Sequence, residues 1–183
     1  MRSEFDLFHN EELLTGDERM VRDSVRGFVQ GRALPIIRKC YREGRFPTEL
    51  IPEIASLGLL GATITGYGCP GIGDTAYGIA MRELERADSG LRSFVSVTSG
   101  LVMYPIYRFG SSAQKAHWLP LLAQGKAIGC FGLTEPDFGS NPSGMRTTAR
   151  LEGGDYILDG VKMWITNGSI ADVAVVYAKC DGR

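Results

Sequence analysis

The sequence predicts an α+β fold: an all-helical amino-terminal domain over residues 1–126, followed by the start of an antiparallel β domain over residues 127–183. Two observations carry this prediction. Up to about residue 126 the apolar residues recur at the helical period. From residue 127 onward, short apolar runs alternate with Gly-Gly, Asp-Gly and Asn-Gly turn signals. The change of period therefore marks the expected domain boundary.

Two capping boxes predict where helices begin. Thr15 stands three residues before Glu18, and Ser111 stands three residues before Gln114. In each pair the hydroxyl can accept a hydrogen bond from the later amide, and the later side chain can bond back to the earlier amide. Helices are therefore expected to start beside Thr15 and Ser111.

Glycine, aspartate and proline punctuate the other helices. Three further helices are expected, at about 48–57, from a cap at Asp74 onward, and at about 90–108. Pro35 and Pro105 lie inside helical patterns, where the missing amide donor forces a kink or a break. Ser89-Gly90 is expected to separate two helices.

The second part is expected to form an antiparallel meander of short strands. The strand candidates are residues 127–133, 147–151, 156–158, 161–166 and 173–178. Tight turns are expected at Gly153-Gly154, Asp159-Gly160 and Asn167-Gly168. Hairpins of this kind do not form a βαβ layout.

The composition excludes several classes of protein. Lys and Arg total 20 against 21 Asp and Glu, so the formal net charge is −1 and no concentrated basic face for nucleic acid is expected. No run of about 18 apolar residues could span a membrane. The segment Met1–Phe8 lacks the features of a signal or transit peptide. We expect a cytoplasmic protein.

The cysteines are expected to be reduced and mostly buried. They stand far apart in the sequence, at Cys40, Cys69, Cys130 and Cys180. No pair has the spacing of metal ligands, and the chain has only two histidines, His9 and His117. No metal site is therefore expected.

A candidate binding site lies where the first strand ends. In Cys130–Ser140, Pro136 must leave the sheet, which exposes backbone amides and the hydroxyls of Thr134 and Ser140. Farther along, Trp164 and Thr166 are expected on one face of a strand, because strand side chains alternate. Such a cluster could hold a flat heterocycle or a phosphate. An ordinary loop beside a core tryptophan fits the spacing equally well.

The stretch Gly66–Gly71 matches the G-x-G-x-x-G pattern of nucleotide-binding loops. That pattern needs a helix at its third glycine and a parallel strand afterwards, whereas here Pro70 and Gly73 delay the helix. We interpret the stretch as a glycine-rich loop between helices.

Three ordered stretches, Glu83–Ser93, Leu101–Tyr107 and Gly132–Pro136, resemble the acyl-CoA dehydrogenase family. The resemblance runs from about residue 12 to the last residue, is weakest over 66–73, and is greatest to members that act on glutaryl-CoA. It implies a helical first domain and a middle β-barrel domain, with a helical last domain missing from this sequence.

The resemblance implies FAD as cofactor. The implied FAD-binding positions are Phe131, Leu133, Thr134, Gly139, Ser140, Trp164, Ile165 and Thr166. Thr134 would hydrogen-bond the flavin ring, Trp164 would pack on it, and Thr166 would lie near the hydride-accepting nitrogen. Ser140 would contact the cofactor diphosphate or the acyl-CoA.

The resemblance also implies a substrate class. Positions Arg92 and Ser93 would hold the distal carboxylate of a dicarboxylyl-CoA, with Glu85 and Ser140 completing the substrate-binding set. A guanidinium fork suits a carboxylate. A solvated ion pair between Glu85 and Arg92 near a helix end is the simpler alternative.

The implied activity is oxidative decarboxylation of glutaryl-CoA to crotonyl-CoA, a step of amino acid catabolism, with electron-transfer flavoprotein as acceptor. The family's catalytic glutamate lies in the last domain, so no catalytic residue is expected in this chain, and the chain alone is expected to be inactive. A full-length form would be a homo-oligomer, in the mitochondrial matrix if eukaryotic. A short- or branched-chain acyl-CoA dehydrogenase and a non-catalytic fragment remain alternatives.

Overall fold

A computed structural model describes residues 10–180 of the chain. Met1–Phe8, where no signal peptide is expected, and His9 lie outside the described residues. The α-helices are α1 (Gly16–Phe28), α2 (Leu34–Glu43), α3 (Ile51–Ser56), α4 (Asp74–Glu85), α5 (Ser89–Ser96), α6 (Tyr104–Phe109) and α7 (Ser112–Ala123). Two π-helical stretches, η2 (Val29–Ala33) and η4 (Val97–Met103), and three 3-10 turns, η1 (Asn10–Leu13), η3 (Thr48–Leu50) and η5 (Pro142–Gly144), complete the helices.

Both predicted capping boxes are confirmed. The amide of Thr15 donates to Glu18 Oε2 at 2.8 Å, and the amide of Glu18 donates back to the Thr15 hydroxyl. Ser111 and Gln114 form the same reciprocal pair at the start of α7. The expectation for α4 is wrong in detail, because Asp74 is its first residue and Gly73, without a capping side chain, is the N-cap.

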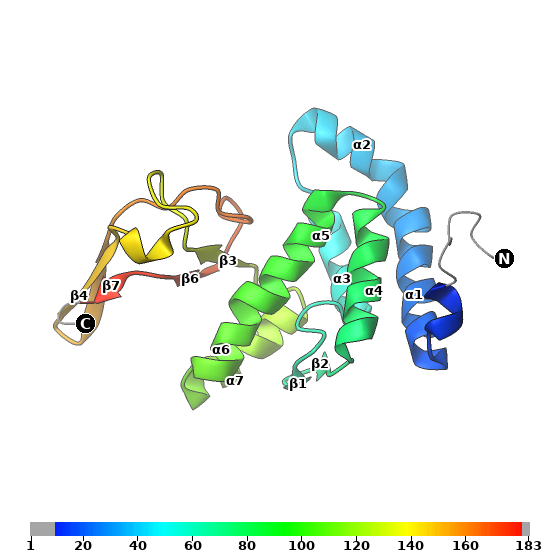
Figure 1. Cartoon of the computed structure of the whole chain (residues 1–183), viewed down its shortest axis with the longest axis horizontal. Coiled ribbons are helices and arrows are strands. Elements are labelled where there is room, and N and C mark those ends of the chain that lie inside the picture. Colours follow the sequence, from blue (N-terminus) through cyan, green and yellow to red (C-terminus); the bar gives the residue numbers. More distant parts are fainter. Residues whose placement is uncertain (1–9, 181–183) are drawn as a thin grey trace.

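The two prolines distort the helices without ending them. Pro35 lies in the first turn of α2, directly after η2, and Pro105 lies in the first turn of α6, directly after η4. A π-helical stretch shifts the hydrogen-bond ladder, so the chain accommodates a residue that cannot donate. As a result α5, η4 and α6 form one rod through the helical part, and α2 continues from α1 (Figure 1).

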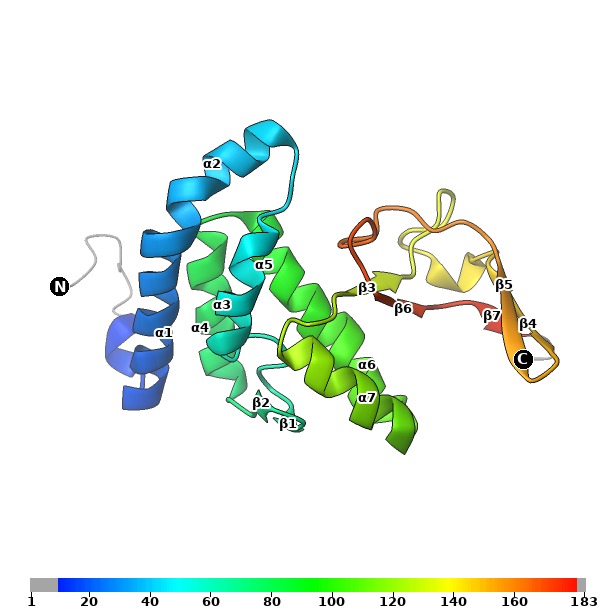
Figure 2. The ribbon, with the colours of Figure 1, turned by 180° about the vertical axis from the view of Figure 1, so that it is seen from behind.

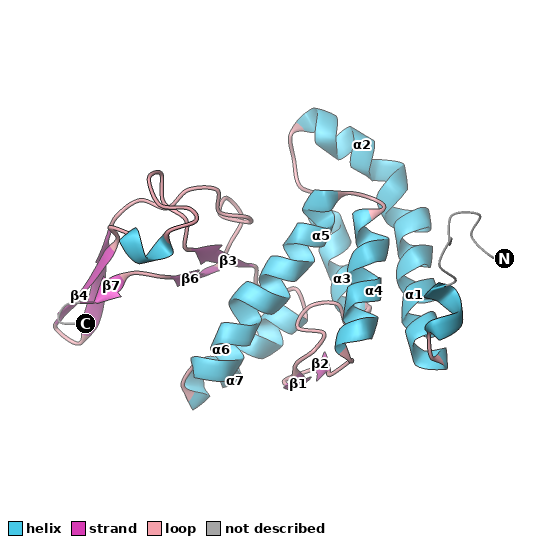
Figure 3. Ribbon diagram, viewed as in Figure 1, coloured by secondary structure: helices cyan, strands magenta, loops and turns pink. Residues whose placement is uncertain are grey.

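The core lies among the helices. Phe94, Leu50, Ile54, Leu84 and Leu91 are fully buried members of one continuous cluster. Figure 3 shows the α-helices gathered on one side of the molecule and most strands on the other. No helix within residues 10–180 is long and apolar enough to cross a membrane.

The strands are β1 (Thr65–Gly66), β2 (Cys69–Pro70), β3 (Gly129–Gly132), β4 (Thr148–Glu152), β5 (Asp155–Asp159), β6 (Val173–Val176) and β7 (Lys179–Cys180). β1 and β2 form a tight hairpin between α3 and α4, so the Gly66–Gly71 stretch connects two helices, as expected, but it contains a short strand pair where only a loop was predicted. The pair β3–β6 lies beside the helices, whereas β4, β5 and β7 stand farther away (Figure 2).

The α+β class is confirmed, but the antiparallel meander is wrong in two pairings. β4 and β5 form the expected hairpin, with Gly153 and Gly154 at positive φ in its turn. β3 and β6 pair in parallel with Gly129 opposite Val173, and β4 and β7 also pair in parallel. After β5 the chain therefore crosses to β3, beside which β6 pairs, and does not form a second hairpin.

The crossing segment explains this difference. Residues 161–166 do not form a strand, because the Met163 amide donates to the Thr134 carbonyl at 2.8 Å and Trp164 has a left-handed φ of 60°. Asn167-Gly168 is likewise no hairpin turn, since the Asn167 side-chain amide donates to the Gly129 carbonyl at 3.0 Å. Asp159-Gly160 ends β5 without starting a paired strand.

Candidate functional site

The exit of β3 and the crossing segment run side by side. After Gly132 the chain leaves the sheet, and the Met163 amide bonds to the carbonyl of Thr134 at 2.8 Å. The two predicted motifs are therefore joined directly, although they are distant in the sequence. Behind them lies η4, which packs on β3.

These elements enclose a cavity of about 220 Å³. It is lined by Val97 and Leu101 of η4, by Phe131, Leu133 and Thr134 at the exit of β3, and by Trp164, Ile165 and Thr166 of the crossing segment. Six of the predicted cofactor-binding positions thus line one cavity, together with two residues of η4 that the sequence did not indicate. A hydroxyl-bearing residue stands on each of the two walls.

Trp164 does not occupy a strand face. Its backbone is left-handed and its side chain is 82% exposed, so the expected alternation with Thr166 is wrong. Both residues still line the cavity. The alternative that Trp164 is a core tryptophan is also wrong, since a core tryptophan would be buried.

Gly139 and Ser140 lie apart from this cavity. They belong to the loop between β3 and β4, after a turn in which Glu135 and Phe138 exchange backbone hydrogen bonds. Ser140 is exposed and does not line the 220 Å³ cavity. The structure therefore separates these two positions from the other six.

A second cavity, of about 600 Å³, adjoins the first. It is lined by Gly44, Arg45, Phe46, Thr48, Gly90, Ser93, Thr166, Asn167, Ser169 and Ile170. Thr166 belongs to both cavities, so Ser93 of α5 shares a lined space with the crossing segment. Arg92 and Glu85 are not among its lining residues.

Arg92 is engaged by neighbours on the helix ends. Its Nε donates to Glu85 Oε2 at 2.8 Å and its Nη1 donates to the Ser96 hydroxyl at 3.4 Å. The hydrogen bond from Arg92, supported by one from Ser89, holds the pKa of Glu85 below its ordinary value. The ion pair that was the simpler alternative is thus present across the gap between α4 and α5.

Sequence reasoning missed a buried carboxylate beside the cavity. Glu135 is only 5% exposed, and it accepts hydrogen bonds from the amides of Arg146 and Thr147, from the Thr147 hydroxyl and from Lys162 Nζ. The bond from the Arg146 amide, followed by those from Thr147 and Lys162, holds the pKa of Glu135 far below its ordinary value. The one signal in the sequence was that Glu135 lies inside Cys130–Ser140 and that Lys162 stands two residues before Trp164.

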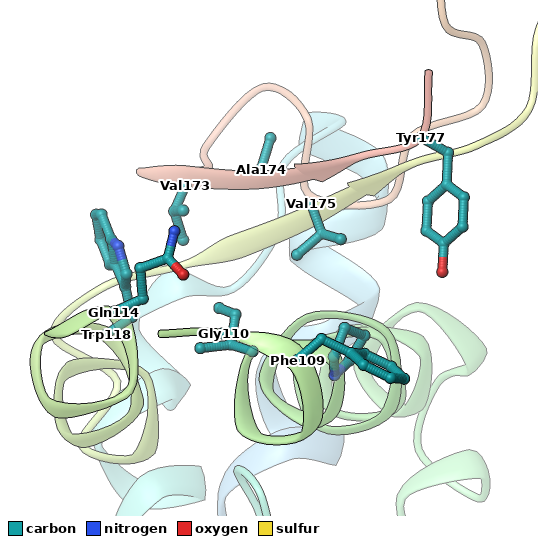
Figure 4. Close-up of a pocket in the computed structure, with 10 residues that line it drawn as sticks. Phe109, Gly110, Gln114, Trp118, Val173, Ala174, Val175 and Tyr177 are labelled. Carbon is teal, nitrogen blue, oxygen red and sulfur yellow. The ribbon is translucent and has the colours of Figure 1, made fainter. Parts of the chain in front are cut away.

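A third cavity is lined by residues of β6, α6 and α7. It has a volume of about 370 Å³ and separates β6 from α6 and α7 (Figure 4). Val173, Val175 and Tyr177 point toward the helices, and Ala174 points away. Gln114 and Trp118 line the opposite wall from α7. None of the predicted site residues lines this space.

Comparison with known proteins identifies the fold. The family model described as acyl-CoA dehydrogenase, N-terminal domain, matches residues 15–126, and the acyl-CoA dehydrogenase middle-domain model matches residues 130–183. The chain belongs to the acyl-CoA dehydrogenase family. The structure of a glutaryl-CoA dehydrogenase from Mycobacterium smegmatis in complex with FADH2 is 55% identical, with a TM-score of 0.93, and the match covers 96% of this chain and 46% of that one.

Two further proteins are also similar to the chain. The mitochondrial short-chain specific acyl-CoA dehydrogenase of Mus musculus is 38% identical over 164 residues, which are 89% of this chain and 40% of the mouse protein. A structure of the electron transferring flavoprotein of Acidaminococcus fermentans matches at 36% identity with a TM-score of 0.85, covering 90% of this chain and 44% of that one. This acyl-CoA dehydrogenase chain thus spans less than half the length of these relatives.

Proposed function

We propose that the chain supplies one wall of the FAD site of an acyl-CoA dehydrogenase. The observation that carries the proposal is the 220 Å³ cavity, where Thr134 and Thr166 lie with the uncovered ring of Trp164. A flat heterocycle with polar edges needs an aromatic face and hydrogen-bonding groups at its rim, so these residues fit a flavin. When bound, FAD supplies the hydride acceptor.

The residues take different roles in this proposal. Trp164 packs its ring against the flavin, and Thr134 and Thr166 hydrogen-bond its polar edge, where fixed donors stabilise negative charge. Phe131, Leu133 and Ile165 make the cavity apolar and exclude water. Gly139 and Ser140 reach the cofactor diphosphate or the acyl-CoA from the neighbouring loop.

We propose glutaryl-CoA as the favoured substrate. Arg92 and Ser93 would bind its distal carboxylate, with Glu85 orienting the guanidinium. Ser93 lies in the cavity that shares Thr166 with the flavin wall, and the 55% identical structure is a glutaryl-CoA dehydrogenase. The whole protein would convert glutaryl-CoA to crotonyl-CoA in amino acid catabolism and pass electrons to electron-transfer flavoprotein. We assign no catalytic base among residues 1–183.

A fluorescence titration tests the flavin wall. In a Trp118→Phe chain, Trp164 is the remaining tryptophan of the sequence. We expect FAD to quench its emission saturably but weakly, because the chain carries only one wall, and FAD should be lost on gel filtration. Thr166→Val should weaken the quenching, whereas Thr75→Val on α4, outside the lining residues, should not. Absence of quenching in the unsubstituted site would contradict the proposal.

The second candidate is a short- or branched-chain acyl-CoA dehydrogenase. It is favoured by the ion pair that already occupies Arg92 and by the similarity to the mouse short-chain enzyme. Ligand-observed NMR distinguishes the two: for a glutaryl enzyme, Arg92→Met should reduce magnetisation transfer to glutaryl-CoA but not to butyryl-CoA. Equal transfer to both ligands, unchanged by the substitution, would favour the short-chain enzyme.

A further inference from the structure

Three chain segments meet at the Glu135 carboxylate. Glu135 follows the exit of β3, and one of its oxygens accepts from the Arg146 amide at 2.6 Å. The other oxygen accepts from the Thr147 amide at 2.9 Å, the Thr147 hydroxyl at 2.5 Å and Lys162 Nζ at 2.9 Å. The start of β4 and the crossing segment are therefore tied to the same side chain.

Lys162 connects the two walls of the 220 Å³ cavity. Besides Glu135, its ammonium group donates to the Leu133 carbonyl at 3.0 Å, and its side chain is 12% exposed. The aliphatic stem passes beside the end of β3, since a Cβ at Gly132 would be in van der Waals contact with Lys162 Cγ at 3.4 Å. One residue later, the Met163 amide bonds to the Thr134 carbonyl. The ion pair thus stands where the two walls come together.

Neither member of the pair can act directly on a ligand in the cavity. Glu135 and Lys162 do not line it, and the carboxylate oxygens are occupied by the four donors described above. Charge-assisted hydrogen bonds between buried groups are short and directional. The Glu135–Lys162 pair therefore restricts the geometry of the neighbouring residues. These residues are Thr134 on one wall and Trp164 and Thr166 on the other.

We propose that the buried Glu135–Lys162 ion pair is a positioning device that sets the spacing between the Thr134 wall and the Trp164–Thr166 wall, and so controls how tightly the cavity binds a flat heterocycle. The identity of that heterocycle rests on the proposed function. The spacing itself rests on the hydrogen bonds of the two side chains. Glu135 and Lys162 are therefore positioning residues and not catalytic ones.

Hydrogen exchange of the complete 183-residue chain tests the spacing without any cofactor. In Lys162→Met we expect the Met163 amide to exchange about tenfold faster or more, because a bond to a charged group is lost at the junction. Amides of α4 should keep their rates. Lys162→Arg should restore most of the protection, since its guanidinium can still reach the carboxylate.

Arg150→Met is the matched control. Arg150 lies on β4 and pairs with Glu152, but both side chains are 59% exposed. This substitution removes the same charge from the same part of the chain, and it should leave Met163 exchange unchanged. The double variant Glu135→Gln/Lys162→Met removes both buried charges at nearly constant shape, so it keeps the test open if Lys162→Met alone does not fold.

An FAD titration completes the test. Lys162→Met in the Trp118→Phe background should raise the Kd for FAD about tenfold, and Arg150→Met should not. Unchanged Met163 exchange in both Lys162→Met and the double variant would overturn the positioning role, as would faster exchange with unchanged FAD affinity. If the unsubstituted chain bound no FAD while Lys162→Met still loosened Met163, the proposed function would fail and the spacing role would stand.

Discussion

At the scale of single residues, Trp164 combines a strained backbone with an uncovered ring. Its φ of 60° is rare for a residue with a large side chain, and the strain is on the order of 1–3 kcal/mol. Because Trp164 is 82% exposed, burial of its side chain offsets little of this strain energy. The surroundings hold the conformation through the Met163 amide bond to Thr134 and the Gly168 amide bond to Ile165. Strain retained beside a cavity is typical of a ligand-binding position.

Replacing Trp164 by glycine should separate stability from binding. Relief of the left-handed strain offsets the greater flexibility of an unfolded glycine, so the unfolding free energy should stay within about 1 kcal/mol of the original. FAD affinity, followed by flavin absorbance, should fall because the aromatic face is lost. Tyr67→Gly is the control, since Tyr67 has a φ of 57° in the β1–β2 turn, away from the cavity. Equal FAD affinity in Trp164→Gly would contradict the assigned role.

Glu83 is the buried charge of the helical part. It is fully buried, and Arg26 grips it with Nε at 3.0 Å and Nη2 at 2.8 Å, while Arg82 and Arg86 lie at 3.3 and 3.8 Å. Burial alone would raise the pKa of Glu83, but the bonds from Arg26 and the charges of Arg86 and Arg82 outweigh it and lower the pKa. The cluster fastens α1 to α4.

Glu83→Gln should destabilise the chain by about 3 kcal/mol, because breaking a buried ion pair leaves the arginines poorly compensated. Glu53→Gln is the matched control. Arg32 binds Glu53 with similar two-point geometry, but those side chains are 62% and 36% exposed, so the loss should be much smaller than that of Glu83→Gln. Urea unfolding followed by far-ultraviolet circular dichroism measures both. Similar losses in the two variants would show that burial does not decide the effect.

The same groups set the acid limit of stability. Glu83 and Glu135 both have a lower pKa in the folded chain than the ordinary glutamate value of about 4.3, so the unfolded chain binds protons first as pH falls. The unfolding free energy should be nearly constant from pH 7 to about pH 5.5 and decrease below that. In Glu83→Gln the unfolding free energy, measured by urea titrations at several pH values, should decrease less steeply as the pH falls. An unchanged slope against pH would show that Glu83 does not contribute to the acid limit.

At the scale of elements, the contact between β3 and η4 depends on Gly129. A Cβ at this position would lie 2.4 Å from Val102 Cγ1, which is closer than two carbon atoms can approach. The absence of a side chain therefore lets the strand lie against the π-helical stretch. That contact carries Phe131 and Thr134 to the same cavity as Val97 and Leu101.

Gly129→Ala should cost about 1–3 kcal/mol, because β3 or η4 must move. Val102→Ala in the same chain should recover part of this loss by removing the opposing methyl groups. Gly27→Ala is the control: nothing lies within 4 Å of a Cβ there, near the end of α1 where the chain continues helically into η2, so it should stabilise by about 0.5–1 kcal/mol. Thermal unfolding of the unsubstituted chain, these three variants and Val102→Ala alone gives the comparison, and additive effects at 129 and 102 would argue against the clash.

Which elements the sequence could predict depends on how local their causes are. The Thr15–Glu18 and Ser111–Gln114 boxes and the Gly153-Gly154 hairpin each arise within a few residues, and they were predicted correctly. The parallel pairing of Gly129 with Val173 joins segments that are far apart, and no local pattern encodes it. Nonlocal pairing is decided by packing of the whole chain.

The same distinction holds for the candidate site. Thr134, Trp164 and Thr166 line one cavity, as their grouping into one candidate site in the sequence anticipated. The conformation of Trp164 was missed, since the pattern around it alternates like a strand. The Met163 amide bond to the Thr134 carbonyl joins this segment to a part of the chain that is distant in sequence, which no local pattern indicates. Ser140 was grouped with Thr134 by nearness in sequence, yet the turn at Glu135–Phe138 sends it elsewhere.

At the scale of the whole molecule, the two parts differ in how much they bury. Among the described residues, the buried hydrophobic side chains run from Val25 to Ala127, and after that only Cys130 and Ala149 join them. The β4–β5 hairpin instead exposes Leu151, Tyr156 and Leu158. The apolar burial that opposes chain entropy is therefore concentrated in the helical part.

This asymmetry leads to a prediction about the proposed boundary at residue 126. Residues 1–126 should keep most of their helical circular dichroism and unfold cooperatively in urea, at a lower midpoint because β3 no longer covers Val102. Residues 127–183 should lack cooperative unfolding, since within the described part of this fragment the buried hydrophobic residues are Ala127, Cys130 and Ala149, too few to form a core. A mixture of the two fragments should regain stability as Phe131, Val173 and Val175 pack again on the helices. If residues 1–126 were unfolded alone, β3 would be part of the helical folding unit, and the boundary would move beyond Gly132.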